Sequence, residues 1–163
     1  MRLQALSRQI QRLHWLISQA NALNADQLEL QAHFARYICV LSAGFLENAI
    51  IDVYSQYARA CSAPAVGDYV ESTLRKMQNP KARRFEETAK AFNKAWEEEL
   101  ATFLNSDGRR EAIDAIMSNR HLIAHGKDSG ITLARLKEYL AKSVAVVEFI
   151  ENQCNINQQN YYP

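Results

Sequence analysis

The part of the chain best suited to chemistry is the nine-residue stretch Ser118–Gly126, which contains Arg120, His121 and His125. With 3.6 residues per helical turn, the two histidines would share one face of a helix, with the arginine close to them near the helix end. Histidine titrates near neutral pH and arginine binds oxyanions through two hydrogen bonds, so the group suits proton transfer beside a bound anion. Gly126 predicts the end of this helix, because glycine readily adopts the left-handed conformation that follows many helices.

Helical periodicity runs through most of the sequence and places this stretch in an all-α fold. The 163 residues include five glycines and three prolines, which is few and favours long helices with short connections. Apolar residues at spacings of three and four predict helices over about 3–20, 25–60, 66–77, 81–104, 109–125 and 133–150. We expect an up-and-down bundle of four long helices with a helical insertion at about 64–105, forming a single domain over residues 1–151, and a polar, poorly ordered tail over 152–163.

The second predicted helix is apolar on nearly all sides over residues 38–46, which indicates a central position in the bundle. Gly44 lies inside it at a cost of about 1 kcal/mol relative to alanine, so we expect a neighbouring helix to approach closely there. Glu47 follows, and its carboxylate, if buried, requires a cationic partner. Arg120 is the best candidate, because a guanidinium can bind a carboxylate bidentately. The alternative is that both side chains point into solvent.

Net charge, cysteine content and the lack of long apolar runs limit the kinds of protein that this sequence can encode. A formal net charge of +1 excludes a global basic field, so a nucleic-acid binder of this sequence would need a local patch. Cys39, Cys61 and Cys154 are odd in number and far apart, which disfavours a disulfide framework or a zinc site and indicates a reducing compartment. The N-terminus lacks a signal-peptide pattern, and the apolar run 37–46 is about half of a membrane span. We therefore expect a soluble, cytoplasmic protein without a cofactor.

The four residues between Arg120 and His125 and the Ile-Ala-His-Gly ending resemble the signature of the HEPN superfamily, whose members are small all-helical domains common in prokaryotic toxin–antitoxin and antiphage systems. The segment Phe45–Asn48 is also similar, because the family often carries an acidic or polar residue there, near the motif arginine. The resemblance covers the second predicted helix and about 107–150, including Gly130–Leu133, and does not extend to 64–105.

The resemblance implies a metal-independent endoribonuclease that acts as a homodimer. It implies Arg120 and His125 as the catalytic pair, with His121, Asn119 and Glu47 in supporting positions. The 2′-hydroxyl of the RNA would be the nucleophile, and two motifs in one groove would supply a base, an acid and positive charge for the phosphorane. It also implies a toxin or antiphage effector whose partners are an RNA substrate and a possible cognate antitoxin protein.

Several interpretations stay open at this point. Lys127, Arg110 and Arg109 are candidate RNA contacts because they flank the motif helix. His121 can instead simply stabilise the C-terminus of the helix, or share a metal with His125, although no acidic third ligand lies between them. The whole chain can also be a non-catalytic HEPN-like binding or dimerisation module that regulates a partner protein, or a helical scaffold unrelated to HEPN.

Overall fold

The fold is all-α, as predicted. The computed structural model describes residues 3–23 and 27–159, with side chains described as far as residue 155, and this part of the chain contains helices and no strands. The helices are α1 (Gln4–Asn21), α2 (Leu28–Cys61), α3 (Pro64–Leu74), α4 (Ala82–Phe92), α5 (Lys94–Leu104), α6 (Arg109–Ala124) and α7 (Leu133–Gln159).

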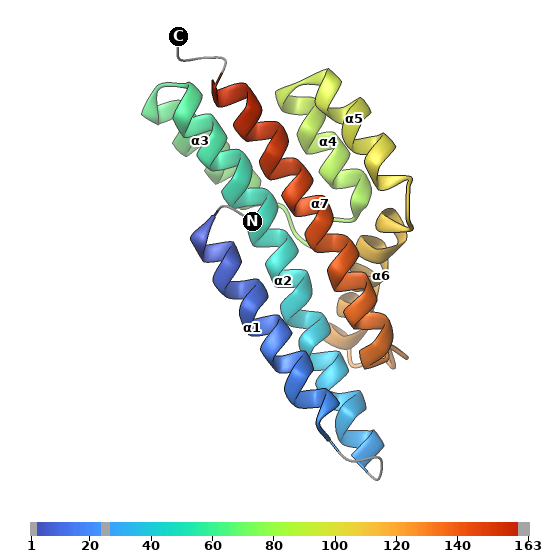
Figure 1. Cartoon of the computed structure of the whole chain (residues 1–163). Coiled ribbons are helices and arrows are strands. Elements are labelled where there is room, and N and C mark those ends of the chain that lie inside the picture. The colour runs from blue at the N-terminus through green and yellow to red at the C-terminus, as the bar shows by residue number, and fades with distance from the viewer. Residues whose placement is uncertain (1–2, 24–26, 160–163) are drawn as a thin grey trace.

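The long helix α2 is the centre of the arrangement. Helices α1, α3, α6 and α7 all pack on it, and α7 runs beside it (Figure 1). The shorter helices α4 and α5 pack on each other and against α6 and α7, at the end of the bundle where α6 begins. The four long helices thus form the body of the fold, and α3–α5 fill the segment predicted as an insertion.

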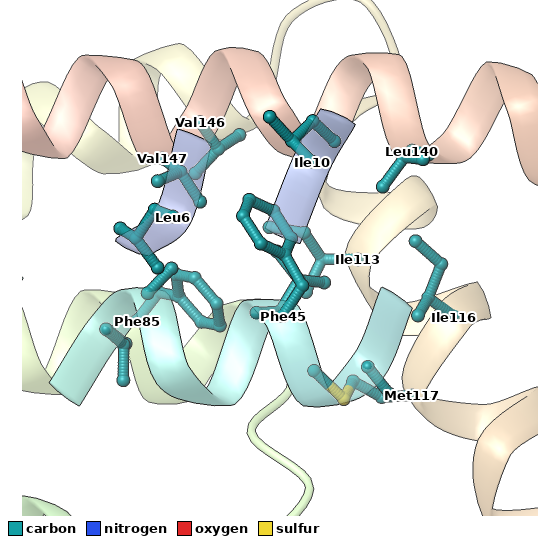
Figure 2. Packing of buried hydrophobic residues seen from close by; sticks show 14 of the residues in the cluster. Leu6, Ile10, Phe45, Phe85, Ile113, Ile116, Met117, Leu140, Val146 and Val147 are labelled. Atoms are coloured by element: carbon teal, nitrogen blue, oxygen red, sulfur yellow. The ribbon is translucent and has the colours of Figure 1, made fainter. Parts of the chain in front are cut away.

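One continuous core joins these helices. Figure 2 shows side chains from α1, α2, α4, α6 and α7 pointing toward one another. Among the buried side chains it labels are Leu6, Phe45, Phe85, Ile113, Ile116 and Val147. Because α4 and α6 contribute to the same core as α1 and α2, the first turns of α6 are held firmly on the bundle.

Helix α2 is the one described helix that is long and apolar enough to cross a membrane by length and composition alone. Just over half of its most apolar window, 56%, is buried inside the fold. A central helix of a bundle passes the same test, because it is surrounded by other helices and so is apolar on most sides. The packing of four helices on α2 accounts for its composition.

The predicted helix over 81–104 is divided in two. Asn93 has extended backbone angles, φ −158° and ψ 126°, and its side-chain oxygen accepts a hydrogen bond from the N–H of Ala95 at 2.8 Å. It therefore caps α5. The apolar spacing continues across this break, and for that reason periodicity alone predicted one helix.

The last helix continues beyond its predicted end at about residue 150, to Gln159. The first part of the predicted polar tail belongs to the fold, because Gln153 and Cys154 are buried, and the Gln153 amide donates to the carbonyl of Trp96 and to Glu99. The last part of the predicted tail, residues 160–163, lies outside the described residues.

Candidate active site

Helix α6 ends at the position that Gly126 predicted. Gly126 has a φ of +66°, and its N–H bonds to the carbonyl of Ile123 at 3.1 Å. The N–H of Lys127 bonds to the carbonyl of Leu122 at 2.9 Å, which completes a Schellman motif. His125 consequently occupies the C-cap, and the chain turns away immediately after it.

The structure brings the two motif histidines together. The ring centroids of His121 and His125 are 4.4 Å apart, with the planes at 64°, and both residues are exposed. They lie at the carbonyl end of α6, in its last turn and at its C-cap. The described residues contain no group of three or more metal-ligating side chains, so a metal bound between the two rings would need further ligands from water or another molecule.

Arg120 lies one turn beyond Ile116, and its backbone amide lies close to the sulfur of Cys39 on α2. The Cys39 thiol donates a weak hydrogen bond to the carbonyl of Ile116, at 3.6 Å. Burial raises the pKa of this thiol to about 12, against the opposing effect of the Arg120 amide, so Cys39 is an uncharged part of the core.

Arg120 is half-buried as a residue, and its guanidinium makes no hydrogen bond or ion pair with any residue that the structure describes. Several other arginines bind carboxylates, as Arg59 does with Asp68 at 3.0 Å. A guanidinium with no partner among the residues described is available to bind an external anion.

The predicted ion pair between Glu47 and Arg120 does not form. The carboxylate of Glu47 accepts a hydrogen bond from the backbone N–H of Asn79 at 2.7 Å, in the connection between α3 and α4. Cys39 is the residue of α2 that lies beside the last turns of α6. Glu47 is eight residues further along α2, about 12 Å away along the helix axis. Its role is therefore to hold the α3–α4 connection.

We predict that Glu47→Ala lowers the free energy of unfolding by about 1.5–3 kcal/mol, because a hydrogen bond to a charged acceptor is lost from the N–H of Asn79. Denaturant titration followed by circular dichroism measures this. Glu98→Ala, which removes an exposed carboxylate of α5, is the matched control and should change stability by less than about 0.5 kcal/mol. If Glu47→Gln left stability unchanged and lowered the rate of RNA cleavage, Glu47 would instead act in the candidate active site.

Two further polar residues lie near the histidines. The side-chain amide of Asn119 donates to the carbonyl of Ala115 at 2.8 Å, so it is engaged within its own helix. Lys127 is exposed just past the helix end. Of the predicted supporting residues, the structure therefore keeps His121 and Asn119 in the motif region, with Lys127 beside them as a candidate RNA contact.

Sequence reasoning did not single out Arg36. Its guanidinium donates to the carboxylate of Asp128 at 3.1 Å and so ties the loop that follows His125 to α2. A signal was present, because Arg36 is the one Lys, Arg, Asp or Glu residue between Leu30 and Leu46 in an otherwise apolar helix. A lone charge in such a helix generally needs an opposite partner.

The structure does not bring Arg109 and Arg110 to this site. Arg109 stacks over the ring of Phe103 at 3.9 Å, and Arg110 binds Glu86, a hydrogen bond that raises the pKa of the guanidinium. Both residues lie in the first turn of α6, about 22 Å along the helix from His125. Their charge is paired where α6 meets α4 and α5, so nearness in sequence did not place them beside the histidines.

A family model described as RiboL-PSP-HEPN matches residues 4–155. The chain belongs to this HEPN family. The match spans nearly the whole chain, including the 64–105 segment to which the sequence resemblance did not extend. No curated protein and no solved structure matches the chain.

The HEPN motif of this chain is thus a small, open cluster at one end of α6. It consists of an arginine without a partner among the described residues and two exposed histidine rings in contact, and the Arg36–Asp128 pair holds the loop that follows. Such a cluster can bind an anion and exchange a proton with it. A single chain offers one arginine and one pair of rings on an open surface.

Proposed function

We propose that this HEPN domain is a metal-independent endoribonuclease in which Arg120 and His125 act on the RNA phosphodiester. The observation that carries the proposal is that the last turn and C-cap of α6 carry two exposed histidine rings in contact and an arginine whose guanidinium has no partner among the described residues. Phosphate is the anion that this combination suits best, because guanidinium binds its oxygens bidentately and imidazole transfers protons near neutral pH.

The proposed reaction uses the nucleophile that RNA carries. A neutral histidine removes the proton of the 2′-hydroxyl, the 2′-oxygen attacks phosphorus, and the bond from phosphorus to the 5′-oxygen breaks. A protonated histidine gives its proton to the departing 5′-oxygen. Arg120 stabilises the additional negative charge on the phosphorane. The products are a 2′,3′-cyclic phosphate and a 5′-hydroxyl end.

The proposal assigns the base and the acid to two motifs, because they act on opposite sides of the same phosphorus and the two rings of one chain are in contact at one helix end. A two-fold homodimer that places both α6 ends in one groove would provide two copies of His125 and two of Arg120. Within each copy the edge-on contact with His121 would orient the His125 ring. The motif is exposed in a single chain, as expected if each chain supplies half of a shared site.

We predict that purified protein cleaves RNA in excess chelator and leaves 2′,3′-cyclic phosphate ends. Gel analysis of end-labelled RNA, followed by acid opening of the cyclic ends, measures both features. Cleavage that disappears with chelator and returns with added Zn²⁺ or Mn²⁺ would contradict the mechanism and favour a metal held by His121 and His125.

In the cell we propose that the domain is a cytoplasmic toxin or antiphage effector restrained by a cognate antitoxin protein. A nucleotidyltransferase-like gene beside its own gene would support a toxin–antitoxin pair. The alternative is a non-catalytic HEPN module that regulates a partner protein, for which the exposed side chains of Val66 and Tyr69 on α3 offer a contact surface. The chelator assay separates the two, because only the enzyme cleaves RNA.

A further inference from the structure

Helix α1 carries positive charge that no acidic residue of the same helix balances. All 18 Asp and Glu residues of the chain lie after residue 25, whereas α1 contains Arg8 and Arg12. Both residues are exposed, and neither side chain forms a hydrogen bond or ion pair with a residue that the structure describes. Because the whole chain has a net charge of only +1, this excess is local, and it favours an anionic ligand at α1.

A hollow between α1 and α2 opens beside Arg12. Its volume is about 340 Å³, and its lining includes Arg12 and Leu13 from α1 and Val40, Gly44 and Phe45 from α2. A Cβ atom added to Gly44 would meet no atom of another helix within 4 Å. The expectation that another helix of the same chain packs closely on Gly44 is therefore wrong, and the space beside the glycine is open to a ligand.

The hollow combines an apolar lining with two side-chain amides. The Asn48 amide donates a long hydrogen bond of 3.4 Å to the side-chain oxygen of Gln9, and both residues line the hollow. An amide group has two N–H donors and an acceptor oxygen, so this one bond leaves donors and an acceptor for a ligand. Pockets of about 300–1,000 Å³ with apolar walls and a few polar groups typically hold small organic molecules. A flat ring with polar edges, such as a nucleobase, matches this lining.

Trp15 adds an exposed aromatic ring one turn from Arg12. Its side chain is 59% exposed, and residues three apart in a helix lie on the same side. Indole rings stack on unpaired bases of any identity, and a guanidinium binds the phosphates between them. An acidic peptide would account for the arginine alone, and a base-paired duplex could not place a base in the hollow. The arginine, the indole and the hollow together favour a single strand of nucleic acid.

We propose that the hollow between α1 and α2 binds an unpaired base of a single-stranded RNA, while Arg12 binds the adjoining phosphate and Trp15 stacks on a neighbouring base. The inference rests on the proposed function, because it takes RNA as the substrate. It adds a binding site away from the reacting phosphate and a preference for unpaired strands, whose bases are free to leave the stack.

The hollow lies close enough to the HEPN motif for one strand to contact both. Arg36 of α2 binds Asp128 in the loop that follows His125. Gly44 is eight residues further along α2, about 12 Å along the helix axis. A few nucleotides cover this distance, since even stacked nucleotides advance by about 3.4 Å each. RNA held in the hollow can therefore present a phosphate to His125.

Binding of a short fluorescent 2′-O-methyl RNA measures the site apart from cleavage, because a methylated 2′-oxygen cannot attack phosphorus. In fluorescence anisotropy, Arg12→Gln should weaken binding by about 10- to 100-fold, as expected when a hydrogen bond to a charged group is lost. It should also reduce the slope of log affinity against log salt by about 0.7, the value per phosphate contact in a single strand. Arg8→Gln removes the same charge one turn earlier, outside the hollow. As the matched control it should weaken binding by less than about 3-fold.

Two further variants test the hollow and the ring. Gly44→Leu fills the hollow and should weaken binding by about 5- to 150-fold, the usual effect of losing one bound base. Its circular dichroism should stay helical, because the chain has room for the new side chain. Gly44→Ala adds only a methyl group and should bind like the wild type. Trp15→Ala should weaken binding over the same range without changing the salt slope, whereas Tyr69→Ala, at a residue of α3 that is 71% exposed, should not.

Equal affinities of Arg12→Gln and Arg8→Gln, or wild-type affinity of Gly44→Leu, would overturn the proposed site. So would equal binding of a duplex, equal binding of a mononucleotide or equally strong competition by poly-glutamate, which would indicate a different ligand. Wild-type protein that shows the expected differences in binding but leaves unmodified RNA intact in chelator would overturn the proposed ribonuclease activity and not the site. Cleavage that Arg12→Gln and Gly44→Leu leave unchanged at sub-saturating RNA would overturn the site and not the activity.

Discussion

His125→Ala should lower the rate of RNA cleavage by about two to four decades, the usual contribution of a positioned general acid or base. The lower rate would come from loss of the reacting ring and not from loss of folding stability, because the ring is exposed and its described contact is with the ring of His121. Thermal unfolding of the variant should therefore match that of the wild type. In the proposed dimer both copies of the ring disappear together, which removes the base and the acid at once.

Initial rates on a fluorogenic RNA in excess chelator measure this effect. His14→Ala, which removes an exposed histidine from α1, is the matched control and should cleave at the wild-type rate. Cleavage by His125→Ala at the same rate as His14→Ala would show that His125 is not a catalytic residue.

Arg120→Ala should reduce cleavage by about 100- to 1,000-fold, as expected when one group that stabilises transition-state charge is removed. Arg120→Lys should fall between the wild type and Arg120→Ala, because it keeps the charge but loses the planar fork that binds two phosphate oxygens. The guanidinium has no partner among the described residues, so its removal leaves no carboxylate unpaired, and we expect little change in folding stability.

Single-turnover cleavage rates of the three proteins give the order of effects. Arg8→Ala, which removes an exposed arginine from α1, is the control for loss of one positive charge at the surface and should have little effect. Equal rates for Arg120→Ala and Arg8→Ala would exclude a specific role for Arg120 in the reaction.

The features that sequence predicted correctly are local. Apolar spacing identified the long helices, and Gly126 marked the end of α6 because only a left-handed residue closes the helix in this way. Threonine is a favoured N-cap residue, and the hydroxyl of Thr132, directly before α7, accepts a hydrogen bond from the N–H of Arg135 at 3.3 Å. Each of these depends on residues within one or two turns of each other.

The features that sequence missed depend on how one helix lies against another. Glu47 and Arg120 have opposite charges and could form an ion pair. The position of α6 along α2 instead puts Cys39 beside the backbone of the arginine and leaves Glu47 near Asn79. The burial of Gln153 depends likewise on the nearness of α5. Periodicity determines the face of a helix on which a residue lies and says nothing of what stands opposite.

The arginines at the two ends of α6 differ in how their charge is paired. In its first turn, Arg110 is bound by Glu86, whereas Arg120, in its last turn, has no carboxylate partner in the part of the chain that the structure describes. With a net charge of +1 the molecule as a whole has little attraction for a polyanion. The unneutralised charge at the end of α6 would therefore orient an approaching nucleic acid toward the motif over roughly a Debye length, about 8 Å at physiological salt. At short range, an approaching strand would thus meet an unpaired guanidinium at the motif and a paired one at the other end of α6.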